Sequence, residues 1–129
     1  MPITYRHDPE QQVTFTTWSG AITAEDIRQH WAVLLSDPGP MQARRSVADI
    51  RDTVPALSGD ELMGLVRRTL APRLDGRGWR VAVVVASPAQ YGKARQFDAM
   101  ADWLVQTKIF DDVDAALAWV REQEPPPAS

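Results

Sequence analysis

The sequence contains no cysteine, and this absence removes several classes of function. Without a thiol, the chain has no disulfide framework, no cysteine nucleophile and no thiolate ligand for a metal. It also has no apolar stretch long enough to cross a bilayer, and its first residues, MPITYRHDPEQQ, lack the apolar core of a signal peptide. We therefore predict a cytoplasmic protein without a membrane span.

Positive charge is neither abundant nor clustered. The chain has 14 Lys and Arg against 17 Asp and Glu, which gives a formal net charge of -3. Domains that bind nucleic acid usually gather basic residues on one face, so we expect no nucleic-acid partner. The length of 129 residues fits one domain that buries a single core.

Patterns of catalytic and metal-binding residues are missing as well. The two histidines, His7 and His30, belong to no group with the spacing of metal ligands. The sequence contains no Gly-x-Ser-x-Gly elbow, no glycine-rich phosphate loop and no His-Glu-x-x-His. Asp49 and Asp52 lack an activated partner, and such carboxylate pairs are usually solvated or salt-bridged. We predict no catalytic residue, no metal site and no cofactor, and a protein that is not an enzyme.

The strongest structural signal that is present lies between residues 80 and 107. The β-branched run from Val81 to Val85 is too continuous for a strand with one face in water, so we expect both faces to be covered. Ser87-Pro88 ends this strand. The apolar residues that follow at steps of three and four are Tyr91, Ala94, Phe97, Ala101 and Leu104. This spacing predicts a long helix with one buried face, and a strand leading into such a helix is typical of α/β domains.

The rest of the chain can be assigned in the same way. Alternation of apolar and polar residues predicts strands at 3–6, 13–18 and 46–50, the first two forming a hairpin, and a brief strand at 109–110. Thr23, Ser58 and either Asp111 or Asp112 are predicted N-caps of three further helices. We expect the first of these helices to end by Asp37 and the second at Pro72, before a turn at 75–78.

The predicted order is β-β-α-β-α-β-α-β-α within one domain, residues 1–124. The proline-rich residues 125–129 cannot continue the last helix, and we expect them to be a disordered tail. A hairpin followed by right-handed β-α-β units gives an α/β fold with a mixed sheet of about five strands and four helices.

Several local phrases, in this order, are similar to a known family. They are Val13 to Gly20 with Thr23-Ala24-Glu25-Asp26, then Val47 to Asp52, Tyr91 to Phe97, and Ile109 to Asp112 leading to Ala115 to Trp119. The chain resembles the SpoIIAA-like family of small bacterial proteins, which is related in fold to STAS domains and grouped with the CRAL-TRIO lipid-binding domains. The resemblance implies this fold and a non-enzymatic role.

The resemblance also draws attention to Ser58. In STAS anti-sigma-factor antagonists, a serine in an Asp-Ser-x-Gly phrase after the third strand is phosphorylated by a partner kinase. Ser58 has the corresponding place, but no aspartate precedes it, and Asp60 and Glu61 would repel an added phosphate. We favour an N-cap role and keep phosphorylation as the alternative.

Candidate ligand-binding residues lie where the central strands end, because ligands of open α/β sheets bind beyond the carboxyl ends of the strands. These residues are Asp49, Arg51, Asp52, Ser87, Tyr91, Gly92 and Arg95. Gly92 in the first turn of a helix indicates a close neighbour, and the free N–H groups there, with Lys93 and Arg95, could hold an anion. Alternatively, Gly92 serves packing and Arg95 pairs with Asp49 or Asp52.

Two functions remain open from the sequence. The first is a regulatory or protein-interaction module of STAS-like fold that acts on an unknown protein partner. The alternative is a carrier or sensor of a small apolar or anionic, lipid-like ligand held near Tyr91 and Arg95, which Gly92 and the five tryptophans favour. Met100 and Trp103 lie off the inner stripe of the long helix, and an apolar patch there would favour a homodimer.

Overall fold

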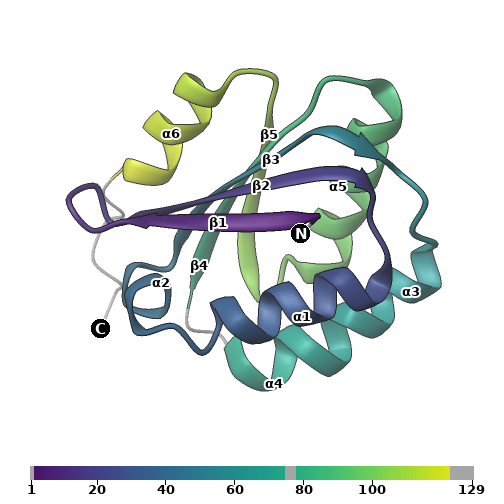
Figure 1. Ribbon diagram of the computed structural model, residues 1–129, viewed down its shortest axis with the longest axis horizontal. Helices are drawn as coiled ribbons and strands as arrows, with labels where there is room; N and C mark the ends of the chain where they lie inside the picture. Colours follow the sequence, from purple (N-terminus) through teal and green to yellow (C-terminus); the bar gives the residue numbers. More distant parts are fainter. Residues whose placement is uncertain (1, 75–77, 123–129) are drawn as a thin grey trace.

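A mixed sheet of five strands forms the centre of the protein (Figure 1). The computed structural model describes residues 2–74 and 78–122. The strands are β1 (Ile3–Asp8), β2 (Val13–Ala21), β3 (Arg45–Val54), β4 (Trp79–Val84) and β5 (Val105–Phe110). They lie side by side in the order β1-β2-β3-β4-β5. As predicted, β1 and β2 form an antiparallel hairpin, and every other neighbouring pair is parallel.

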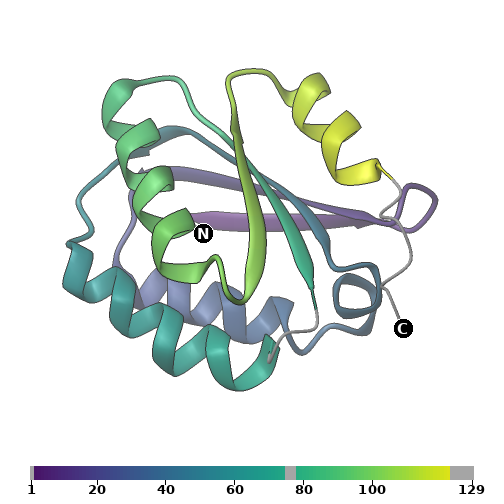
Figure 2. The same cartoon turned by 180° about the vertical axis from the view of Figure 1, so that it is seen from behind.

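The helices cover the two faces of the sheet unequally. They are α1 (Ala24–Leu34), α2 (Pro38–Ala43), α3 (Gly59–Leu65), the π-helical segment η1 (Val66–Leu70), α4 (Ala71–Leu74), α5 (Pro88–Ala101) and α6 (Val113–Arg121). Figures 1 and 2 show α1, α5 and the continuous α3–α4 rod on one side of the sheet and α6 on the other. None of the described helices is long and apolar enough to span a membrane.

Both faces of β4 are buried, as its β-branched sequence predicts. Val84 packs with Val47 and Val120 beneath α6, whereas Val83 packs with Ala94 of α5 on the opposite face. Successive side chains of a strand point to opposite faces, so β4 contributes to two cores at once. The face covered by α1, α3–α4 and α5 holds the larger core and the cavity described below.

The predicted long helix is shorter than its apolar spacing indicates, and Tyr91 does not lie on its inner face. The helix α5 ends at Ala101, and residues 105–110 form β5 instead of a brief strand at 109–110. Tyr91 is 46% exposed, and Gln90 takes the inward position with 4% exposure. The Gln90 amide nitrogen donates to the carbonyls of Arg51 and Thr53 at 2.9 Å each, which satisfies its buried polar group.

Pro72 does not end the second helix, contrary to the prediction. Proline has no N–H for an α-helical bond and its ring clashes with the preceding turn. The chain widens into η1 just before it, where the N–H of Ala71 donates to the carbonyl of Val66, and then continues as α4 to Leu74. The predicted turn at 75–78 and the tail at 125–129 lie wholly or mainly outside the described residues.

Two further segments differ from the prediction. The strand β3 runs from Arg45 to Val54, beyond the predicted 46–50, because it pairs with β2 as far as Val54. The short helix α2 forms where only a break was expected. The Asp37 side chain accepts from the N–H of Gly39 at 3.3 Å, and Pro38 occupies the first turn, where proline is tolerated.

Candidate functional site

The candidate residues that end β3 form a surface ion pair. The Arg51 guanidinium donates to both carboxylate oxygens of Asp49, at 2.9 and 2.8 Å. This bond from Arg51 holds the pKa of Asp49 below its ordinary value. Asp52 is exposed and adds a weaker attraction on Arg51. The partner of Asp49 is therefore Arg51 and not Arg95, which corrects one of the two pairings considered from the sequence.

The candidate residues of α5 face water rather than an enclosed site. The Ser87 hydroxyl is an N-cap that accepts from the N–H of Gln90 at 3.1 Å. The Arg95 guanidinium lies 6.0 Å from the centre of the Tyr91 ring. A side chain added at Gly92 would meet no atom within 4 Å, so the expected close approach at Gly92 is wrong. Binding of a ligand by these residues stays a prediction.

Ser58 caps α3. Its hydroxyl accepts from the N–H of Glu61 at 3.1 Å, and the Glu61 carboxylate accepts from the N–H of Ser58 at the same distance. This reciprocal pair is the predicted capping box, which confirms the N-cap role. Phosphorylation of Ser58 stays a prediction.

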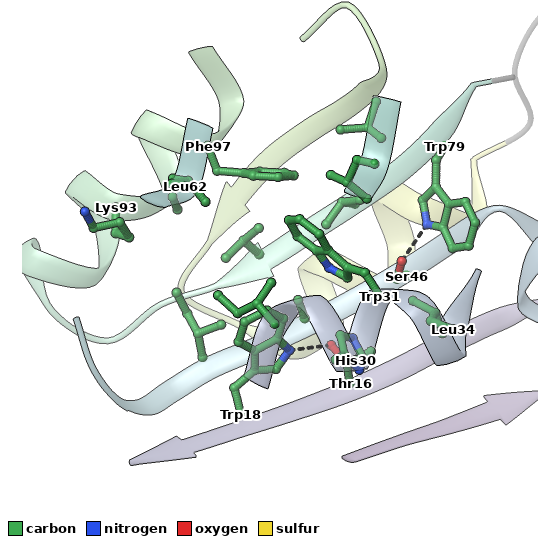
Figure 3. A pocket seen from close by; sticks show the side chains of 18 of the residues that line it. Thr16, Trp18, His30, Trp31, Leu34, Ser46, Leu62, Trp79, Lys93 and Phe97 are labelled. Atoms are coloured by element: carbon green, nitrogen blue, oxygen red, sulfur yellow. Dashed lines mark hydrogen bonds between the residues drawn. The ribbon is translucent and has the colours of Figure 1, made fainter. Parts of the chain in front are cut away.

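A cavity of about 150 Å³ lies between the sheet and the helices that cover its larger core (Figure 3). Its walls come from β2, β3, β4 and β5 on one side and from α1, the α3–α4 rod and α5 on the other. Ala48 of β3 and Ala94 of α5 both line it, and their short side chains leave the space that larger residues would fill. Of the residues that the sequence connects with a ligand, Lys93 lines this cavity, whereas Asp49, Arg51, Asp52, Ser87, Tyr91, Gly92 and Arg95 do not.

The wall of the cavity is mainly apolar, and most of its polar groups are already paired. The indole N–H of Trp18 donates to the Thr16 hydroxyl at 2.9 Å, and that of Trp79 donates to the Ser46 hydroxyl at 2.6 Å. Lys93 lies at the rim, and Figure 3 shows its ammonium directed away from the other labelled side chains. The ammonium is hydrogen-bonded to the Leu57 carbonyl and the Gln96 side chain.

His30 differs from these residues. Its side chain lines the cavity with 8% exposure, and within residues 2–74 and 78–122 it has no hydrogen-bond partner. It is held by ring contacts, with centroids 6.1 Å from Tyr5 and 5.5 Å from Trp18. Burial lowers the pKa of His30 to about 4, so the imidazole is neutral at pH 7.

This arrangement is suited to binding an apolar molecule. No Asp or Glu lines the cavity, and the part of the chain that the structure describes has no group of three or more potential metal ligands. A concave, largely apolar space with few polar groups is the usual form of a small-molecule site, and this cavity is partly open to solvent.

The sequence contains one signal for His30, which is its position on an apolar stripe. His30 follows Ile27 by three positions and precedes Leu34 by four, so it lies on the buried stripe of α1. A polar residue on such a stripe is a candidate for a buried functional group. The spacing of metal ligands does not single out His30, because neither histidine of the sequence belongs to such a group.

Comparisons with known proteins agree with this fold. An uncharacterized protein with a SpoIIAA-like fold from Shewanella loihica PV-4 is 21% identical, with a TM-score of 0.58 over 92% of this chain and 93% of that one. An anti-sigma factor antagonist from Mycobacterium paratuberculosis is 19% identical, with a TM-score of 0.55 over 93% of this chain and 95% of that one.

At these identities, the two solved structures show a shared fold alone. The curated proteins include no match. The SpoIIAA-like family model, however, matches residues 13–121, from the start of β2 to the end of α6. The chain belongs to the SpoIIAA-like family.

Proposed function

We propose that this protein is a non-enzymatic regulatory module that binds one small, uncharged, largely apolar molecule in the cavity beneath α1, α3–α4 and α5. The observation that carries the proposal is the cavity of about 150 Å³ with its apolar wall. An engineered apolar cavity of about this size in another protein stays dry and binds benzene. A ligand with one aromatic ring, or an aliphatic molecule of similar volume, therefore fits.

The charges around the cavity favour an uncharged ligand over an anion. Lys93 is the only Lys or Arg in the described wall, and its ammonium is bonded at the rim to Leu57 and Gln96. His30 is neutral because burial disfavours its charged form. An anion would enter the cavity without a cation to compensate for its lost hydration, which is costly.

The helices that the ligand would contact support a regulatory role. The cavity is bounded by α1, α5 and the α3–α4 rod, and the rod contacts both α1 and α5. A molecule that fills the space adds contacts to all three. It stabilises their arrangement by RT ln(1 + L/Kd), where L is the ligand concentration, and this term rises with the logarithm of L once L exceeds Kd. The surface that these helices present to a partner protein would then differ between the empty and the occupied protein.

Titration with toluene, followed by amide NMR, tests the proposal. We expect saturable shifts for residues of the cavity wall and a rise in Tm. Ala48→Leu or Ala94→Leu fills the space and should abolish both effects, whereas Ala118→Leu, on the exposed side of α6, should leave them unchanged. Absence of saturable shifts in the unaltered protein, or equal shifts in the filled variants, would contradict the proposal.

The second candidate function is association with another protein chain, and exposed Trp103 favours it. Trp103 follows α5 and is 61% exposed, and its indole N–H donates to the Met100 carbonyl at 3.0 Å. A second copy of the chain would cover this side chain. Sedimentation velocity at rising concentration should then show a dimer that Trp103→Ser abolishes, and a monomer throughout would count against the homodimer.

A further inference from the structure

We propose that His30 is the polar recognition group of the cavity and that the ligand carries one uncharged oxygen group, a hydroxyl or a carbonyl, that hydrogen-bonds to its imidazole. This inference rests on the proposed function and names the chemical class of the molecule bound. Figure 3 shows His30 in the wall of the cavity, beside Thr16 and below Trp31.

The neighbours of His30 leave its imidazole without a hydrogen bond. Tyr5 and Trp18 contact the ring, but the Tyr5 hydroxyl donates to Asp37 at 2.9 Å and the Trp18 indole N–H donates to Thr16. No residue among those described pairs with the imidazole nitrogens. Among the described residues, the Thr107 hydroxyl oxygen is the one fully buried side-chain atom without a partner, so the imidazole nitrogens are not sealed off but face space that a water or a ligand can reach.

The chemistry of the imidazole defines that partner. A neutral imidazole has one N–H donor and one ring nitrogen that accepts. A hydroxyl can satisfy either atom, and a carbonyl oxygen can accept from the N–H. A carboxylate would need a cation, which neutral His30 does not supply.

Half-buried Trp31 adds a second hydrogen-bond donor to the wall of the cavity. Its side chain also lines the cavity, and its indole N–H, a donor only, has no hydrogen-bond partner in the part of the chain that the structure describes. The adjacent His30 and Trp31 thus present unpaired donors from the same turn of α1. An acceptor oxygen on the ligand could bond to one of these donors, whereas a hydrocarbon could bond to neither.

The volume of the cavity limits the size of the apolar part of the ligand. A cavity of about 150 Å³ holds a single aromatic ring or a short branched chain. The class that fits both the space and the unpaired groups is a monocyclic phenol or a small aryl or branched-alkyl alcohol or ketone.

Isothermal titration with toluene and with p-cresol tests the inference, because these molecules differ by one hydroxyl. An apolar cavity without a partner favours toluene, since the cresol hydroxyl would lose its bonds to water. We expect the opposite here, with p-cresol binding about threefold to tenfold more tightly. His30→Phe should remove that preference, His30→Gln should keep it in part, and His7→Gln, outside the cavity, should not change it.

The outcomes separate the two proposals. If neither molecule binds the unaltered protein, the proposed function fails. If both bind but toluene binds as tightly as p-cresol, or if His30→Phe keeps the preference, the cavity is a binding site and the role of His30 is overturned. If His30→Phe does not fold, the ratio of the affinities for p-cresol and toluene is compared between the unaltered protein and His30→Gln. A ratio that is unchanged in His30→Gln then overturns the role of His30.

Discussion

The indole N–H of Trp79 donates to the hydroxyl of Ser46 across 2.6 Å, and this bond joins β4 to β3 in the wall of the cavity. Both side chains are buried, Trp79 with 3% and Ser46 with 5% exposure. Each group therefore depends on the other for its hydrogen bond.

Ser46→Ala should lower the free energy of unfolding by about 1 to 3 kcal/mol, because it leaves the Trp79 N–H buried without an acceptor. Urea denaturation followed by circular dichroism measures the change. The matched control is Ser19→Ala, since Ser19 is exposed on β2. An effect of Ser46→Ala no larger than that of the control would show that the bond is unimportant.

The stability of the protein should fall between pH 6.5 and 4 because of His30. Its pKa is lowered from 6.5 to about 4 in the folded state, so between these values the unfolded chain binds a proton that the folded chain does not. The stabilisation is complete above pH 6.5, and its loss by pH 4 amounts to as much as about 3 kcal/mol.

Urea denaturation at several pH values tests this dependence. His30→Phe should flatten the slope in this window, since His7 and the carboxylates remain in both proteins. Identical slopes for the unaltered protein and the variant would mean that His30 titrates normally in the folded state.

Gly92→Ala should stabilise the protein. Gly92 lies inside α5, and a Cβ there would meet no atom within 4 Å, so alanine brings its higher helix propensity without a clash. We expect a gain of at most about 1 kcal/mol in the free energy of unfolding. Gly20→Ala is the contrasting control. Gly20 has φ +79°, a conformation that alanine rarely adopts, so this variant should be less stable than the unaltered protein. A loss of stability in Gly92→Ala would contradict the open surroundings of Gly92.

Arg51→Gln should raise the pKa of the Asp49 carboxyl toward its ordinary value. The bond from Arg51 is the main cause of the lowered pKa, which stabilises the folded state above the unfolded pKa and ceases to do so as the pH falls through the folded one. NMR titration of side-chain carboxyls measures the shift. The pKa of Asp8, lowered chiefly by Gln11, should stay unchanged and serves as the internal control. If the pKa of Asp49 does not move, its partner in solution is not Arg51.

Much of the fold follows from short stretches of sequence. The hairpin of β1 and β2, the doubly buried β4 and the caps at Thr23, Ser58 and Asp112 all depend on neighbours within a few positions along the chain. The predictions from sequence were wrong where a local periodicity competed with pairing or packing between distant parts of the chain. Leu104 continues the helical spacing of α5, yet Val105 already pairs with Trp79 in the sheet.

The sequence by itself determined the order of the strands and of the longer helices, the caps and the two apolar faces, because these depend on periodicity and local hydrogen bonds. Only the tertiary structure decided where space remains and which polar groups lack a partner. The cavity is bounded by residues as distant in the sequence as Thr16, Ala48 and Phe97. Whether His30 is paired depends on side chains from β1 and β2, which periodicity within α1 cannot specify.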